Sequence, residues 1–137
     1  MKINILGSGQ EVGRSSIILD ESVMMDCGVK IEPAPPQYPN VEKVGSAIIS
    51  HAHLDHIGAA PLLTKKWGTR VFMNDITLEL GAMLLKDSIK VAYKEGYGTP
   101  FTMKDTKQLI KNAKIVAYKK KFRIGDKTFS LWPSGHV

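Results

Sequence analysis

Three of the four histidines of this chain lie within six consecutive residues, His51 to His56 (HAHLDH), together with an aspartate. They directly follow residues 45–50 (GSAIIS), a short apolar run typical of a strand buried on both faces. Imidazoles and carboxylates are zinc ligands, and α/β folds place their active sites at the ends of such strands. This segment therefore predicts a layered fold in which a buried strand ends at a polar site.

The spacing within the segment indicates two metal ions. In an extended turn, His51 and His53 point the same way and can bind one ion, because alternate side chains of extended backbone share a face. Asp55 and His56 follow after the chain bends and can bind a second ion. Two ions about 3.5 to 4 Å apart can activate water at neutral pH. A chance cluster of surface or core histidines is the alternative, which the number and position of ligand types disfavour.

Two further residues extend the candidate site. His136 follows an expected strand at 127–132, and a third imidazole from a strand end suits a zinc held by three histidines. An unpartnered tail histidine is the alternative. Asp26 ends another expected strand, where it can orient an imidazole or cap a turn. The candidate metal ligands are therefore His51, His53, Asp55, His56 and His136, and the candidate catalytic carboxylates are Asp55 and Asp26.

Patterns of strands and helices alternate along the chain. Strands are expected at 2–6, 15–19, 23–26, 45–50, 70–73, 115–118, 121–124 and 127–132. Helices are expected at 58–67, from a cap at Asn74 to near Gly96, and from Thr102, which has the spacing of a capping box with Asp105. Four of the seven prolines lie within residues 32–40, which predicts an irregular loop. The order of elements predicts an α/β domain, a mixed sheet with helices on one face.

Composition and charge restrict the class of partner. A chain of 137 residues suits one domain, and 43% apolar residues suffice for a core. The net charge of +6 favours a polyanion, nucleic acid before membrane. Lys119 to Lys121 with Arg123, together with Lys104, Lys107, Lys111 and Lys114, can contact phosphates or form a solvated basic face. A single cysteine, Cys27, and the lack of a signal peptide or spanning segment predict a cytoplasmic location.

The segment His51 to His56 resembles the His-x-His-x-Asp-His signature of the metallo-β-lactamase superfamily. Other motifs are similar to the β-CASP branch, the RNA-processing nucleases related to the cleavage and polyadenylation specificity factor and to bacterial ribonuclease J. They are residues 9–15 (GQEVGRS), 25–28 (MDCG), 51–59 (HAHLDHIGA), 84–88 (LLKDS) and 134–137 (SGHV). The resemblance covers nearly the whole chain.

The resemblance implies the N-terminal half of an αββα sandwich and a ribonuclease that uses two Zn²⁺ ions. One zinc would be held by His51, His53 and His136, and the other by Asp55 and His56. Asp26 would contact a ligand without binding a metal itself. Family members continue with a bridging aspartate, a further histidine and a β-CASP domain that closes over RNA. Residues 1–137 are therefore expected to be the N-terminal portion of a metallo-β-lactamase domain, inactive alone, with RNA and the remaining C-terminal portion as partners. The sequence leaves open whether the protein forms a homo-oligomer.

Two alternative functions remain at this stage. Other relatives of the same fold hydrolyse thioesters or similar small substrates, and some relatives keep the fold, lose the ligands and act as scaffolds. The net charge and the flanking motifs favour RNA over a thioester. The intact His51, His53, Asp55 and His56 argue against a non-catalytic scaffold.

Overall fold

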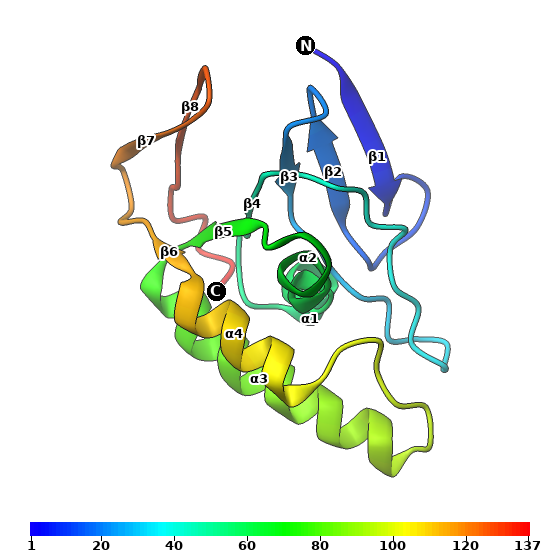
Figure 1. Ribbon diagram of the computed structural model, residues 1–137. Coiled ribbons are helices and arrows are strands. Elements are labelled where there is room, and N and C mark those ends of the chain that lie inside the picture. Colours follow the sequence, from blue (N-terminus) through cyan, green and yellow to red (C-terminus); the bar gives the residue numbers. More distant parts are fainter.

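The computed structural model describes residues 1–137 and has a mixed six-stranded sheet in the order β1 to β6, with a separate two-stranded hairpin (Figure 1). The strands β1 to β3 pair antiparallel, and β3 to β6 pair parallel. Their bounds are β1 Ile3–Gly7, β2 Ser16–Leu19, β3 Val23–Met25, β4 Ser46–Ile48, β5 Arg70–Met73 and β6 Lys114–Ile115, and the hairpin is β7 Lys121–Ile124 with β8 Lys127–Ser130. The predicted mixed sheet is confirmed.

Four helices complete the fold: α1 Leu54–Ile57, α2 Ala60–Trp67, α3 Asp75–Lys94 and α4 Met103–Asn112. The predicted caps are present, because Asn74 accepts a hydrogen bond from the Thr77 amide at 2.6 Å, and Thr102 with Asp105 forms a complete capping box. These side chains satisfy amide groups that have no partner within the first helical turn. No helix of the chain is long and apolar enough to cross a membrane.

Alternation along the central strands directs apolar side chains to both faces of the sheet. In and after β4, Ala47 and Ile49 belong to the core beneath the helices, whereas Ile48 contacts a second cluster with Val23 and Ile124 of the hairpin. Side chains of a strand alternate between faces, so the run at 45–50 is buried on both sides. Helices therefore cover one face, as predicted, and the hairpin covers part of the other (Figure 1).

Several predicted boundaries are wrong by a few residues. β3 stops at Met25 rather than residue 26, because Asp26 has a left-handed φ of 59° that breaks the extended backbone. β4 stops at Ile48 rather than residue 50, and β8 ends at Ser130 rather than residue 132. The predicted strand 115–118 is the short β6, after which the chain turns.

The segment before the predicted helix 58–67 is also helical. α1 begins at Leu54, because the His53 carbonyl accepts hydrogen bonds from the His56 and Ile57 amides, both at 2.9 Å. The extended turn predicted for His51 and His53 therefore ends at His53, and the predicted bend before Asp55 is the start of a helix. Asp55 and His56 lie on the first turn of a helix.

Leu63 of α2 is completely buried in the core between helices and sheet. We predict that Leu63→Ala lowers the free energy of unfolding by about 2 to 5 kcal/mol, the range for a buried leucine truncated to alanine. Met83→Ala is the matched control, because Met83 is 60% exposed on α3, and it should change stability by less than about 0.5 kcal/mol. Urea unfolding measures both values, and equal losses would contradict the assigned core.

Candidate metal centre

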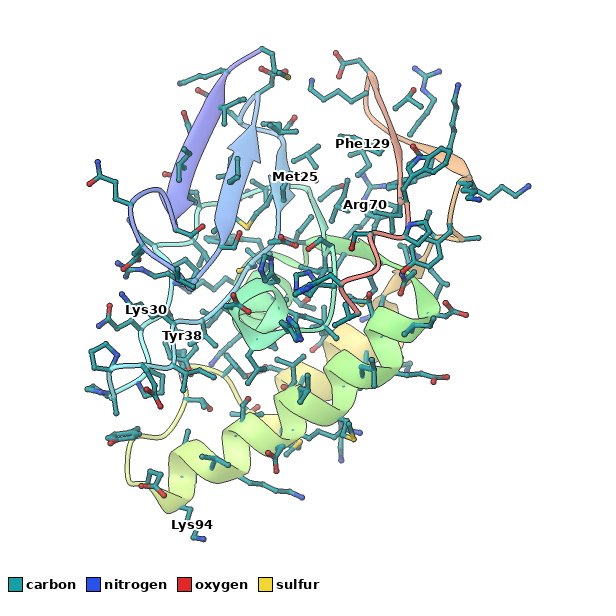
Figure 2. All side chains as sticks on the ribbon, turned by 180° about the vertical axis from the view of Figure 1, so that it is seen from behind. Met25, Lys30, Tyr38, Arg70, Lys94 and Phe129 are labelled. Atoms are coloured by element: carbon teal, nitrogen blue, oxygen red, sulfur yellow. The ribbon has the colours of Figure 1, made fainter.

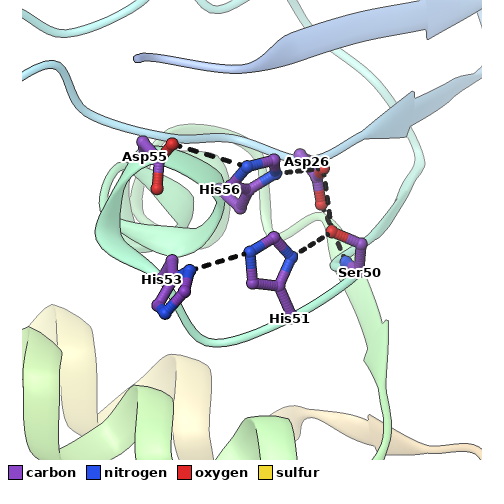
Figure 3. A network of polar contacts seen from close by, with 6 residues as sticks. All are labelled: Asp26, Ser50, His51, His53, Asp55 and His56. Carbon is purple, nitrogen blue, oxygen red and sulfur yellow. Dashed lines mark hydrogen bonds and ion pairs between the residues drawn. The ribbon is translucent and has the colours of Figure 1, made fainter. Parts of the chain in front are cut away.

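The candidate site lies at the carboxyl ends of the parallel strands β3 and β4 (Figure 3). Asp26 directly follows β3, and the segment with Ser50 and His51 follows β4. His136 comes from the segment after β8. Adjacent parallel strands end at the same edge of a sheet, which is why Asp26 meets the segment after β4.

Three imidazoles converge at this edge. One ligand atom from each of His51, His53 and His136 lies within 4.8 Å of the others, and His51 Nε2 lies 3.2 Å from His53 Nδ1. The ring centroid of His136 is 5.0 Å from that of His51 and 5.0 Å from that of His53. A tetrahedral zinc with Zn–N bonds of about 2.05 Å needs ligand nitrogens about 3.4 Å apart. The His51–His53 pair has this spacing, and His136, within 4.8 Å of both, completes an all-imidazole donor set suited to one zinc ion.

A second pair of ligand-type groups lies beside the first. His56 Nε2 is 3.5 Å from Asp55 Oδ2, and the His56 ring centroid is 4.0 Å from that of His51 (Figure 3). Both side chains come from the first turn of α1, which lies at the edge of the sheet beside the histidine triad. The structure thus places Asp55 and His56 next to the histidine triad, where they can hold a neighbouring ion.

Asp26 connects two of the histidines. His56 Nδ1 lies 2.7 Å from Asp26 Oδ2, and Ser50 donates to Asp26 through its amide at 2.7 Å and its hydroxyl at 3.0 Å. His51 Nδ1 is 2.9 Å from the Ser50 hydroxyl oxygen. A carboxylate only accepts, so His56 Nδ1 and the Ser50 hydroxyl donate to it, and His51 Nδ1 donates to the serine oxygen. The Nε2 atoms of His51 and His56 keep their lone pairs for a metal.

The charges around the site favour neutral His51 and a protonatable His56. Burial, followed by the neighbouring His56, lowers the pKa of His51 below its ordinary value. The hydrogen bond from His56 to Asp26 raises the pKa of His56. Because only a deprotonated nitrogen binds a metal, a proton on His56 competes with the second ion. Burial also raises the pKa of the Cys27 thiol far above its usual range, so in this structure Cys27 is an uncharged member of the core.

Backbone hydrogen bonds attach α1 to the segment after β3. The Cys27 amide donates to the His56 carbonyl at 2.8 Å, and the Val29 amide donates to the Leu54 carbonyl at 2.9 Å. Gly28 lies between these bonds, where an added Cβ would be 1.6 Å from the Asp55 carbonyl oxygen. Only glycine therefore allows this approach.

Sequence reasoning assigned no role to Ser50 or Gly28. Ser50 directly precedes the histidine segment, and Gly28 belongs to the motif at 25–28, so both were adjacent to assigned residues. Their roles depend on contacts with Asp26 and Asp55, which are distant in the chain. The one local signal for Ser50 was its position as a polar residue next to the histidine segment.

The model of the metallo-beta-lactamase superfamily matches residues 11–129. The chain belongs to this superfamily. Its relatives include the "Probable RNase MJ4" of Methanocaldococcus jannaschii, which is 35% identical over the whole chain, and the "RNase aCSPSF2" of Saccharolobus solfataricus, 34% identical over 98% of the chain. The "Cleavage and polyadenylation specificity factor 73" of Drosophila melanogaster is 31% identical over the whole chain. These relatives are β-CASP family members, which confirms the resemblance.

The chain spans only part of each relative: 34% of RNase MJ4, 28% of RNase aCSPSF2 and 22% of the Drosophila protein. Among solved structures, a metallo-beta-lactamase superfamily protein of Sulfolobus tokodaii superposes with a TM-score of 0.52 at 16% identity, over 92% of this chain and 52% of that chain. This likeness concerns the fold alone. It confirms the predicted α/β fold of the metallo-β-lactamase type.

Gly28 offers a test of how α1 is held. We predict that Gly28→Ala lowers the free energy of unfolding by about 3 kcal/mol and weakens zinc binding, because the new methyl group displaces the Asp55 backbone. Gly45→Ala is the matched control, since a Cβ at Gly45 meets nothing within 4 Å. Urea unfolding and zinc titration measure the two effects. A Gly28→Ala protein with parental zinc affinity would refute the assigned packing.

Asp26 offers a test of the hydrogen-bond network. Because the pKa of folded His56 is raised, its pair with Asp26 stabilises the metal-free protein at pH below the usual imidazole pKa, and this stabilisation is lost as pH rises through the raised value. We predict that Asp26→Asn lowers the His56 pKa in the metal-free protein, as measured by NMR titration. Zinc affinity, measured where His56 is neutral in both proteins, should fall about 10- to 100-fold.

The control for this change is Asp87→Asn, a carboxylate of α3 that makes no ion pair. It should leave both the pKa of His56 and the zinc affinity as in the parent. A His56 pKa that stays raised in Asp26→Asn would show that another group holds the proton.

Proposed function

We propose that this chain carries the metal centre of a zinc-dependent ribonuclease of the β-CASP type. The observation that supports the proposal most strongly is the convergence of His51, His53 and His136 beside Asp55 and His56. Two relatives that match all or nearly all of the chain are named RNases, and two others that match it as fully are named transcription termination factor FttA. The chain's net charge of +6 suits a polyanionic substrate better than a neutral thioester.

The residues of the site have two kinds of role: some would bind the metal ions, and others position the ligand side chains. His51, His53 and His136 would hold one zinc, and Asp55 with His56 would hold a second. When bound, two zinc ions activate water for attack on phosphorus and stabilise charge on the phosphate oxygens. Asp26 keeps the ring of His56 fixed directly and the ring of His51 fixed through Ser50. Asp26 acts as a positioning residue, whereas Asp55 would bind the second metal directly.

The two proposed metal positions differ in the number of ligands. The first has three imidazoles, whereas the second has the Asp55 carboxylate and the His56 imidazole alone. Fewer protein ligands bind a metal more weakly, so residues 1–137 should hold the first ion firmly and the second weakly. Two-metal hydrolysis needs both ions. The proposed activity is therefore that of a protein of the relatives' length, and the isolated chain should be inactive.

His53→Ala tests the first metal position. We predict that it abolishes zinc binding at the triad and changes the free energy of unfolding of the metal-free protein by less than about 1 kcal/mol, because His53 precedes α1 and contributes to no core cluster. Zinc titration followed by elemental analysis measures the loss. Gln108→Ala, an exposed change on α4, is the control. Full zinc content in His53→Ala would contradict the assignment.

A chimera tests the reaction itself. Residues 1–137 replace the matching segment of RNase MJ4, and the zinc-loaded chimera is assayed with labelled single-stranded RNA and with a thioester. We expect RNA cleavage that the His53→Ala change in the same chimera abolishes, which excludes a contaminating nuclease. A folded chimera that hydrolyses the thioester and leaves RNA intact would overturn the proposed function.

A further inference from the structure

We propose that the outer face of the β7–β8 hairpin binds single-stranded RNA and directs it toward His136. This inference rests on the proposed function, because it names a surface for the same substrate. The outer face is defined by the exposed residues Lys119, Lys121, Arg123, Thr128, Ser130 and Trp132.

The inner face fixes which side chains point outward. Ile124 lies with Val23 and Ile48 in the second core cluster, and the Phe122 ring stacks on Phe72 with centroids 5.5 Å apart. Met25 and Phe129 also lie between sheet and hairpin (Figure 2). Because side chains of a strand alternate, this packing directs the neighbouring residues of both strands to solvent. The outer face is therefore a fixed surface on the sheet.

The cations of the outer face have no acidic partner. Lys121 lies opposite Ser130 and Arg123 opposite Thr128, and none of Lys119, Lys121 and Arg123 forms an ion pair. By contrast, Lys127 is paired with Asp20 at 3.0 Å and with Asp126 at 3.1 Å. Three unpaired cations on one ribbon match the phosphates of a nucleic-acid strand.

An indole extends this basic ribbon toward the metal centre. Trp132 is 65% exposed, its Nε1 donates to the Ser130 hydroxyl at 3.0 Å, and the Lys119 ammonium lies 5.7 Å from the ring centroid. Single-stranded nucleic acids are bound by basic surfaces that carry aromatic rings on which bases stack. Trp132 and His136 are four residues apart, so their Cα atoms lie at most about 14 Å apart. A base stacked on Trp132 places its strand beside the triad.

The opposite approach to the site has the wrong charge for RNA. A cavity of about 550 Å³ opens beside His53 and Asp55, and a second of about 350 Å³ shares Leu54 and Leu84 with it. Their other lining groups include Glu32, Asp87 and Glu95, and the one nearby lysine, Lys30, is already paired with Glu11 at 2.7 Å. Carboxylates repel phosphates, so the basic hairpin is the favourable side of entry.

Fluorescence anisotropy with a labelled oligouridylate of about 12 nucleotides tests the surface on the metal-free chain. Replacing Lys119, Lys121 and Arg123 by alanine should weaken binding at least about tenfold and reduce the salt slope by about 2, because each single-strand phosphate contact contributes about 0.7. The control replaces three exposed lysines of α4, Lys104, Lys107 and Lys111, which removes the same charge. It should change affinity less than about twofold.

Trp132→Ala separates base stacking from charge. It should weaken oligouridylate binding about tenfold and leave the affinity for inorganic polyphosphate unchanged, because polyphosphate has no bases. Trp132→Phe should restore most of the RNA affinity, and Tyr93→Ala, at a residue 61% exposed on α3, should have no effect. Circular dichroism confirms that each variant is folded.

Each outcome decides one claim. Equal losses in the hairpin and α4 variants, no RNA binding by the parent chain, or an equal effect of Trp132→Ala on polyphosphate would overturn the proposed surface. Since binding is measured without metal, these results leave the proposed function to the chimera assay. Oligouridylate binding as expected, together with a chimera that cleaves no RNA, would overturn the proposed function and keep the surface.

Discussion

The carboxylate of Asp26 organises the part of the candidate metal centre that carries His51 and His56. It accepts hydrogen bonds from the Ser50 amide and hydroxyl and contacts His56, so it joins the end of β3 to the end of β4 and to α1. The left-handed backbone of Asp26 ends β3 and turns this side chain toward β4. Without this acceptor, the rings of His51 and His56 would lose the interactions that fix which nitrogen faces the metal.

The fold supplies this network with a rigid base. Parallel pairing of β3 with β4 brings Asp26 and Ser50 to one edge, and burial of Ala47, Ile48 and Ile49 on two faces fixes β4. The contact of Gly28 with the Asp55 carbonyl then places α1 directly against the segment after β3. Ligands carried by rigid elements lose less entropy when a metal binds. The apolar core thus contributes to metal affinity without touching the ion.

Local patterns in the sequence predicted β4, the caps at Asn74 and Thr102 and the candidate ligands, because each of these signals lies within a few residues. The start of α1 at Leu54 was not predicted, since its first turn depends on backbone bonds to residues 27–29. Ser50 was missed for the same reason: its partner Asp26 is 24 residues away. The left-handed φ of Asp26 was also not predicted, because the residue at that position is not a glycine.

The candidate metal centre borders a cavity lined by Glu32, His53 and Asp55, and His136 follows the basic hairpin in sequence. The central feature of this centre, an ion held by three imidazoles from separate segments, can be observed directly. Anomalous diffraction at the zinc edge from crystals of the zinc-loaded chain measures where the ion lies. The peak is predicted within bonding distance of His51 Nε2, His53 Nδ1 and an imidazole nitrogen of His136. A zinc ion bound elsewhere, with these three rings uncoordinated, would contradict the account.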